Sequence, residues 1–327
     1  MALWLAALLL PGPGLVWREQ WSLNRLASRD GLDLFHFPTN TASLCFPCPF
    51  VLTLHDTIEL EGNPWEGKRP FLEGLRRRAM TAYGRLSSAR AARKAAKVIT
   101  VSNHVKDRAS SFLGLPQNRF VPIHSGPGSP PLVLSQAKRD RLLSQYGLSA
   151  GYVLALTGVD RRKNAAAVLE GHLNLPPSLR ESAPLVFVAP RRSQARSWLD
   201  LPSEVKVAEG PDEEGMAALM GAAGLFVFPS FDEGFGFPPL EAMGYGTPVV
   251  ASGIPTHREI LGEAPLWVDP NEPQSVQEAM RKVLTDRDLA EAMRRRGRAA
   301  HQRLSWEKTA RSVLDVYEEA LMRGPSS

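Results

Sequence analysis

Two carboxylates, Glu233 and Glu241, bracket a turn that contains two glycines. The apolar run 225–228 before this turn is typical of a strand buried in a parallel sheet, and Pro238-Pro239 suits the first turn of a helix. Glycine lets the backbone approach a ligand closely, and N–H groups at a helix start bind phosphate. The pattern therefore predicts a site for a phosphorylated ligand. Two glutamates at this spacing without that context would more often be solvated surface.

A cluster of cations follows another predicted strand. The run 151–156 is apolar, and Arg161, Arg162 and Lys163 come before the helical pattern of residues 165–173. Cations at a strand-to-helix turn can neutralise a diphosphate, and arginine can do so with two parallel hydrogen bonds. Asn164 is the predicted cap of the helix. Outside such a context, three bases would more often be plain surface.

A polar triplet ends a strand in the first half of the chain. Thr53, His55 and Asp56 lie at the end of the predicted strand 50–54, where side chains of a parallel sheet face a cleft. Considered alone, His55 would more often be a hydrogen-bonded structural histidine.

Together these residues resemble the retaining glycosyltransferases of family 4, which have the GT-B fold. The resemblance covers about Trp21 to Leu321 and is most specific in the second half. It is carried by the following motifs: Thr53-x-His55-Asp56, Arg162-Lys163-Asn164, Glu233-Gly234-Phe235-Gly236, Leu240-Glu241-Ala242-Met243 and Gly246-Thr247-Pro248-Val249-Val250-Ala251-Ser252. The two glutamates stand in the family's E-x7-E spacing.

The resemblance implies transfer of a sugar from a nucleotide-diphosphate sugar to a glycan or lipid-linked acceptor, with retention of configuration. It implies that Glu233 and His55 are catalytic and that Glu241 binds the ribose diol. The implied donor-binding residues are Arg162, Lys163, Gly234, Phe235, Gly236, Phe237, Leu240 and Glu241. The combination of T-x-H-D, R-K-N and E-G-F-G resembles bacterial mannosyltransferases of polysaccharide assembly, which favours GDP-mannose. No Asp-x-Asp ends a strand, so we expect neither a metal nor another cofactor.

The alternation of strands and helices predicts an α/β protein with two Rossmann-like, doubly wound domains that face a cleft. We place an acceptor-side domain at 1–130, a nucleotide-sugar domain at 131–304, and a helix at 305–327 that returns to the first domain. Two other functions fit the same fold: a sugar-nucleotide 2-epimerase and a weakly active or non-catalytic nucleotide-binding protein.

The start of the chain departs from the family pattern. The family opens with a strand and a glycine-rich turn, whereas Gly12-Pro13-Gly14 is followed by residues that do not continue as the expected helix. We therefore expect a first domain that lacks its opening βα unit. The apolar run at 1–17 has no positive residue before it and is broken early by proline, so we interpret it as the start of a globular domain rather than a signal peptide.

The segment 68–97 holds ten bases and one acid. Leu75, Ala79, Ala82, Leu86 and Ala89 recur at helical spacing, which predicts a basic amphipathic helix or helix pair. Its basic face is either solvated or a surface for anionic lipid headgroups or a lipid pyrophosphate. Nucleic acid is not expected as a partner, because no aromatic platform accompanies the charge.

The composition is that of an ordinary globular protein of 327 residues, with 43% hydrophobic and 22% charged residues. Two cysteines cannot form a disulfide framework, which favours a reducing, cytoplasmic location. Cys45 and Cys48 form a C-x-x-C in a proline-rich loop with no second pair, so we interpret them as incidental.

Overall fold

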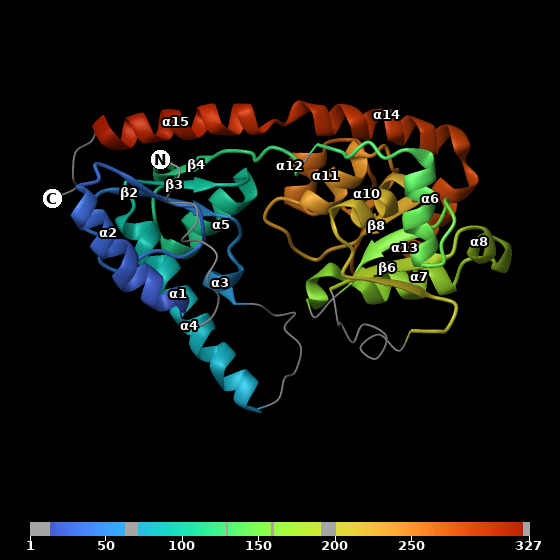
Figure 1. The fold of residues 1–327 in the computed structure, drawn as a ribbon, viewed down its shortest axis with the longest axis horizontal. Helices are drawn as coiled ribbons and strands as arrows, with labels where there is room; N and C mark the ends of the chain where they lie inside the picture. Colours follow the sequence, from blue (N-terminus) through green and yellow to red (C-terminus); the bar gives the residue numbers. More distant parts are fainter. Residues whose placement is uncertain (1–13, 63–70, 129, 158–159, 191–200, 323–327) are drawn as a thin grey trace. The chain divides into compact units, whose positions relative to one another are not determined.

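The computed structural model describes residues 14–62, 71–128, 130–157, 160–190 and 201–322. The chain forms two compact units (Figure 1). The first contains the described residues up to Ile123 together with the C-terminal residues from Thr309, and the second runs from His124 to Lys308. The expected absence of a glycine turn at 12–14 concerns residues that lie, except for Gly14, outside the described part of the chain.

The first unit is built on a parallel sheet whose four strands lie in chain order. They are β1 (Phe35–Phe37), β2 (Phe50–Leu54), β3 (Lys97–Thr100) and β4 (Phe120–Pro122). Every residue of β2 and of β3 is buried. Apolar, β-branched runs of this kind suit strands that are covered on both faces, and the predicted strand 50–54 is confirmed as β2.

The helices of the first unit connect and cover these strands. They are α1 (Gly14–Trp17), the π-helical turn η2 (Arg18–Ser22), α2 (Leu23–Asp30), α3 (Ile58–Glu61), α4 (Phe71–Lys94), α5 (Asn103–Leu113) and the 3-10 turn η3 (Gln117–Arg119). Ser102 caps α5 by accepting a hydrogen bond from Val105 N at 3.2 Å, and Gly114 ends it with φ 62°. These local signals set where α5 begins and ends.

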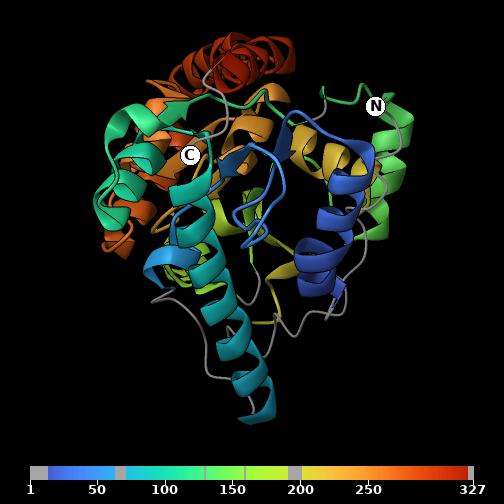
Figure 2. The ribbon, with the colours of Figure 1, turned by 90° about the vertical axis from the view of Figure 1, so that its left-hand side faces the viewer.

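The predicted apolar stripe on α4 is wrong at three of the four positions whose side chains are described, and the fourth, Ala89, is half-buried. Ala79, Ala82 and Leu86 are exposed, Leu86 by 59%. The buried face is instead made of small and hydroxyl residues, namely Gly84, Ser87, Ser88, Ala91 and Ala92. The reason is close approach: Ser87 Oγ donates to Ala42 O at 2.7 Å and accepts from Ala42 N at 3.1 Å. The N-terminal end of α4 projects past the other described helices of its unit (Figures 1 and 2).

The last helix, α15 (Trp306–Met322), packs on the first unit from Thr309 onward. Val316 and Ala320 join the buried cluster around Val51 and Ile99. The ammonium of Lys97, whose side chain is 7% exposed, lies 2.8 Å from Glu319 Oε2. A buried ammonium is tolerated only when it is paired, so this contact fixes the register of α15 on the sheet.

The second unit is built on a six-stranded parallel sheet in the order β10-β9-β8-β5-β6-β7. The strands are β5 (Val153–Leu156), β6 (Leu185–Ala189), β7 (Lys206–Glu209), β8 (Leu225–Phe228), β9 (Val249–Ser252) and β10 (Leu266–Val268). This is the doubly wound order, with the chain building outward from β5 in one direction and from β8 in the other. The order reverses between β5 and β8, which are direct neighbours.

Helices cover both faces of this sheet, as a doubly wound unit requires. They are α6 (Gln136–Gln145), the 3-10 turn η4 (Arg161–Lys163), α7 (Ala165–Leu173), α8 (Pro177–Ser182), α10 (Glu213–Ala222), α11 (Phe237–Gly244), α12 (Pro255–Leu261), α13 (Pro273–Thr285) and α14 (Arg287–Arg303). The core includes Phe187, Leu225 and Val276, each fully buried. Among the described residues, no helix has the length and apolar content needed to cross a membrane.

Candidate active site

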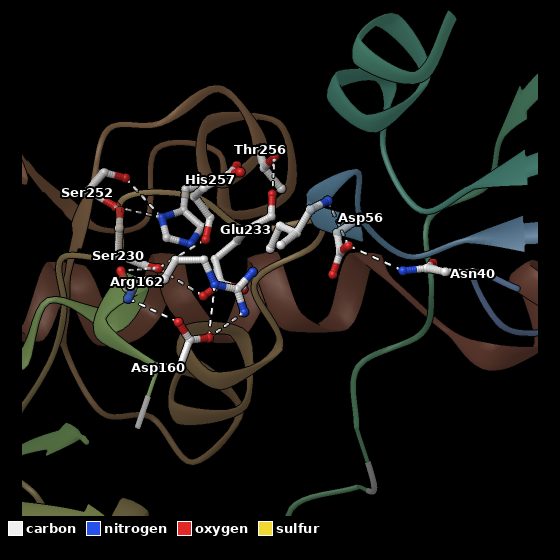
Figure 3. A network of polar contacts seen from close by, with 11 residues as sticks. Asn40, Asp56, Asp160, Arg162, Ser230, Glu233, Ser252, Thr256 and His257 are labelled. Carbon is white, nitrogen blue, oxygen red and sulfur yellow. Dashed lines mark hydrogen bonds and ion pairs between the residues drawn. The ribbon is translucent and has the colours of Figure 1, made fainter. Parts of the chain in front are cut away.

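The order of the second sheet brings the predicted cations and the first predicted carboxylate together. The loop after β5 carries Arg162, the loop after β8 carries Glu233, and the two strands are neighbours. Arg162 Nη1 lies 3.8 Å from Glu233 Oε2 (Figure 3). Ligands of doubly wound sheets bind at the carboxyl ends of the strands where the strand order reverses. The two residues therefore lie where such a fold places a ligand.

Asp160 holds Arg162 in place, and the sequence analysis missed it. Its carboxylate accepts from Arg162 Nε at 3.2 Å and lies 3.1 Å from Nη2. The same carboxylate accepts from the backbone N of Arg162 at 3.0 Å and so caps η4. The two-residue spacing from Arg162 was visible in the sequence, but it did not show that the acid faces the guanidinium rather than solvent.

Ser230, also missed, orients Glu233. Its hydroxyl lies 2.9 Å from Glu233 Oε1, and 3.1 Å from the carbonyl oxygens of Arg162 and Asp232. The hydroxyl has one proton for these three acceptors. Ser252 Oγ donates to Ser230 O at 2.6 Å, so the end of β9 supports the loop after β8.

The backbone of Glu233 is fixed from a third direction. Thr256, on α12, donates its hydroxyl to Glu233 O at 2.8 Å (Figure 3). Burial raises the pKa of the Glu233 carboxyl, while Arg162, Ser230 and Lys163 act in the opposite sense. A carboxylate with raised basicity beside a guanidinium suits a group that must respond to charge forming next to it.

His257 lies beneath the glycine turn. It is fully buried, and burial lowers its pKa to about 4, so the ring is neutral at pH 7. Its Nδ1 donates to Ser252 O at 3.0 Å, which leaves Nε2 as an acceptor without a partner among the described residues. A Cβ on Gly236 would lie 2.9 Å from the His257 ring, and Gly236 has φ 94°. Glycine is therefore required at this position.

The other predicted donor-binding residues differ in what they can offer a ligand. Lys163 and Phe237 are half-buried, whereas Gly234 and Phe235 are buried. Leu240 is fully buried, and its N–H bonds to Gly236 O at 3.4 Å. This corrects the expectation for Leu240, because its side chain belongs to the core of the unit and its N–H is already used.

The N–H groups at the start of α11 are fewer than the sequence analysis expected. Pro238 and Pro239 occupy the first turn and have no N–H. The N–H of Leu240 is bonded to Gly236 O. Of the backbone N–H groups predicted to bind phosphate at this turn, those of Gly236 and Phe237 therefore remain as candidates.

The predicted cap role of Asn164 needs a correction. Asn164 stands at the N-cap of α7 with φ 55°, but its side chain makes no capping bond. Its amide instead donates to Pro229 O at 3.2 Å and to Pro270 O at 2.7 Å. Asn164 therefore joins the loops after β5, β8 and β10, because asparagine tolerates the left-handed conformation that this position requires.

The second predicted carboxylate, Glu241, lies inside α11. It is half-buried, has no hydrogen-bond partner among the described residues, and burial raises its pKa. A carboxylate in such a position gains from a ligand that supplies hydroxyl donors.

In the first unit, Asn40, which was not predicted, holds two residues of the polar triplet, His55 and Asp56. Asn40 accepts from the backbone N of His55 at 2.7 Å and donates to Asp56 Oδ1 at 3.2 Å (Figure 3). His55 is exposed, and its Nε2 donates to Pro38 O at 3.1 Å.

The predicted triplet residue Thr53 contacts a second histidine of low pKa, the half-buried His36. Its Nε2 is 2.7 Å from Thr53 Oγ1, and its Nδ1 is 2.6 Å from the hydroxyl of Tyr317 on α15. Burial, followed by the nearby His55, lowers the pKa of His36 to about 4. A neutral imidazole donates one hydrogen bond and accepts one, so the three side chains form a defined chain that links β1, β2 and α15.

The described residues contain no group of three or more His, Cys, Asp or Glu side chains arranged to hold a metal ion. Cys45 and Cys48 are both free. Burial and the nearby Asp33 raise the pKa of the Cys48 thiol, the opposite of what a reactive thiolate needs.

Both halves of the chain match family models. Residues 151–300 match the model described as "Glycosyl transferases group 1", and residues 5–126 match "Glycosyltransferase Family 4". The O-antigen chain mannosyltransferase B of Escherichia coli is 31% identical over 234 residues, which are 68% of this chain and 60% of that protein. The serotype-specific mannosyltransferase WbdA of Escherichia coli is 26% identical over 238 residues, which are 70% of this chain and 29% of that protein.

Among solved structures, HepE from Anabaena, determined in complex with UDP-glucose, shares the fold. Its TM-score is 0.65 at 20% identity, over 83% of this chain and 72% of that one. The chain therefore spans less than two thirds of the two curated relatives, and its similarity to the solved structure concerns the fold.

Proposed function

Because the chain belongs to the family 4 glycosyltransferases, with a group 1 domain and the GT-B fold, we propose that it transfers a hexose from a nucleotide-diphosphate sugar to a glycan or lipid-linked acceptor. We propose retention of configuration and a reaction that needs no metal ion. The observation that carries this proposal is the cluster of Arg162 and Glu233 at the reversal of the second sheet.

Departure of the nucleotide builds negative charge on the diphosphate. Arg162 stabilises that charge, with Lys163 beside it and the N–H groups of Gly236 and Phe237 at the start of α11. Asp160 keeps the guanidinium of Arg162 oriented through contacts at 3.2 and 3.1 Å. Charge stabilisation of this kind needs groups that are already in place before the bond breaks.

The same step builds positive charge on the sugar ring. Glu233 stabilises that positive charge or binds the sugar hydroxyls. Its contact with Arg162 at 3.8 Å places the sugar site next to the diphosphate site. Glu241 binds the ribose diol. Retention suits a mechanism in which the leaving phosphate takes the proton of the acceptor, so we assign no separate base. We place His55 beside the donor sugar or phosphate.

The relatives favour particular donors. Two of them are mannosyltransferases, one of an O-antigen chain, which supports mannose as the sugar and a polysaccharide as the product. HepE, with a similar fold, was solved with UDP-glucose, which supports a nucleotide sugar as the donor class. We propose GDP-mannose as the first donor to test.

The experiment is a donor screen followed by transfer. The purified chain is titrated with GDP, UDP and ADP, and the matching radiolabelled sugar nucleotide is incubated with lipid-linked and soluble glycan acceptors. We expect one nucleotide to bind, label to move to an acceptor, and EDTA to leave the rate unchanged. Labelled donor isomerised at C2 without transfer would instead indicate an epimerase, and loss of activity with EDTA would refute the metal-independent site.

We also propose that the segment 68–97 contacts an anionic membrane surface. Arg85, Leu86 and Arg90 on α4 are exposed, as are Trp17 and Trp21, whose rings stack at 5.4 Å. Exposed tryptophan and arginine side chains are typical of surfaces that contact the headgroups of anionic lipids. Sedimentation with phosphatidylglycerol vesicles tests it, and equal sedimentation with neutral phosphatidylcholine vesicles would contradict it. The cytoplasmic location stays a prediction.

A further inference from the structure

The segment of residues 124–128 and 130–132, here called the strap, runs along the helix that carries Glu241 (Figure 1). At one end, a Cβ on Gly126 would lie 2.5 Å from the backbone N of Trp306 and 2.6 Å from its Cγ. At the other end, Leu132 N donates to the hydroxyl of Tyr245 at 3.2 Å, directly after α11. The strap is therefore held against its own unit on both sides of Gly128.

Between these two anchors, Gly128 faces the carboxylate of Glu241. A Cβ on Gly128 would overlap Oε1 of Glu241 and lie 3.2 Å from its Cδ. The carboxylate has no hydrogen-bond partner among the described residues, and the strap backbone at Gly128 lies directly against it. A ribose that binds this carboxylate then lies next to the strap backbone.

We propose that Gly128 is a positioning residue for ribose recognition, because its lack of a side chain leaves the space in which Glu241 keeps its carboxylate directed at the ribose diol. The strap is then the second wall of the ribose subsite. This rests on the proposed function, in which Glu241 binds the ribose of the donor. Gly128 thereby contributes to the selection of a ribonucleotide, although it has no side chain that could contact the ligand.

A methyl group at this position should change the site without unfolding the protein. Gly128 is not among the glycines with positive φ, so alanine can adopt its backbone conformation. The atom displaced is the end of a flexible side chain, which can rotate away at little cost. The anchored strap does not need to move. Gly128→Ala therefore removes the carboxylate from its place while leaving the rest of the unit intact.

The test is a double-mutant cycle on nucleotide affinity. Isothermal titration gives Kd for the tightest binder among GDP, UDP and ADP, and for its 2′-deoxy form. We expect Gly128→Ala to weaken the ribonucleotide about tenfold, the size of a lost hydrogen bond to a charged group, and the 2′-deoxynucleotide much less. In a Glu241→Ala background, Gly128→Ala should have no further effect. Gly221→Ala is the matched control, because its Cβ would meet only Tyr245 Cδ1 at 3.7 Å.

Additive losses in the cycle, or unchanged affinity in Gly128→Ala, would overturn the inference. A second readout needs no ligand: NMR titration of the Glu241 carboxyl, assigned by comparison with Glu241→Gln. Burial raises the pKa of this carboxyl, and Gly128→Ala should lower it by turning the group toward solvent. If the pKa of the Glu241 carboxyl were unchanged in Gly128→Ala, the contact between Gly128 and Glu241 would be refuted. A wild-type chain that binds no nucleotide, with the pKa change present, would instead refute the proposed function and the ribose role that depends on it.

Discussion

At the scale of single residues, the two predicted carboxylates of the site differ in their hydrogen bonds. Glu233 is fixed by Ser230 and Thr256 and contacts Arg162, whereas Glu241 has no hydrogen-bond partner among the residues that the structure describes. A held carboxylate next to a cation suits charge that appears only in the transition state. An open carboxylate suits a ligand group that the reaction leaves unchanged.

Glu233→Gln should therefore lower kcat by a large factor, about a hundredfold or more, and change nucleotide Kd little. Glu241→Gln should chiefly weaken the nucleotide, because the ribose hydroxyls keep the same charge throughout the reaction. Steady-state rates and isothermal titration on both variants give the two numbers. If both substitutions changed only nucleotide affinity, and by equal amounts, the division of roles would be wrong.

Asp160→Asn should weaken diphosphate binding through its effect on Arg162. The amide cannot pair with the guanidinium as the carboxylate does at 3.2 and 3.1 Å, so Arg162 loses its orientation. We expect about a tenfold rise in the Kd of the nucleoside diphosphate, and little change for the nucleoside without phosphates. Equal loss for both ligands would show a general disturbance of the unit instead.

At the scale of elements, the sequence predicted what local patterns determine. The buried strands β2 and β8 and the helix α7 were predicted with their observed bounds, because apolar runs and helical spacing are read along the chain. The contacts of Ser230 with Arg162 and of His36 with Tyr317 could not be predicted. Their partners are set by strand order and by the path of α15, which no local window contains.

The helix α4 shows the other limit of pattern reading. A pattern of apolar residues in the sequence reveals the buried face of a helix only when that face consists of large apolar side chains. Here Ser87 and its small neighbours let residue 42 approach the helix, so the buried face carries little hydrophobic signal. A polar residue that is satisfied by a backbone carbonyl can be fully buried.

Ser87→Leu should consequently destabilise the protein, and Ala82→Leu should not. The first change overpacks a fully buried position and leaves the N–H and carbonyl of Ala42 without the Ser87 hydroxyl. We expect a loss of about 2 kcal/mol or more in the free energy of unfolding. Ala82 is exposed, so its substitution serves as the control in the same denaturant titration. Equal losses of unfolding free energy in the two variants would contradict the observed buried face and support the apolar stripe that the sequence predicted.

At the scale of the whole molecule, each unit contains a histidine that is neutral at pH 7, half-buried His36 in the first and fully buried His257 in the second. Burial lowers the pKa of both His36 and His257 to about 4. In the unfolded chain a histidine has a pKa of about 6.5, so between these values the unfolded state binds protons that the native state excludes. The stability that each histidine contributes is therefore complete above about pH 6.5 and falls as the pH drops toward 4.

Lowering the pH from 7 to 4 should thus reduce the free energy of unfolding, by up to about 3 kcal/mol for each histidine. Glu233 and Glu241 act in the opposite sense near the bottom of this range, since burial raises both pKa values. Urea titrations across this range measure the slope. His36→Gln and His257→Gln should each flatten it, and a slope unchanged in both variants would contradict the neutral state of the two rings.

The central claim is that the reversal of the second sheet, with Arg162 beside Glu233, is the diphosphate site of a nucleotide-sugar donor. The most direct measurement is the Kd of GDP, UDP and ADP for the wild type and for Arg162→Ala, by isothermal titration. We expect one nucleotide to bind the wild type, and Arg162→Ala to raise its Kd about tenfold or more, the size of a lost hydrogen bond to a charged group. A nucleotide that binds the wild type and Arg162→Ala equally well would contradict the central claim.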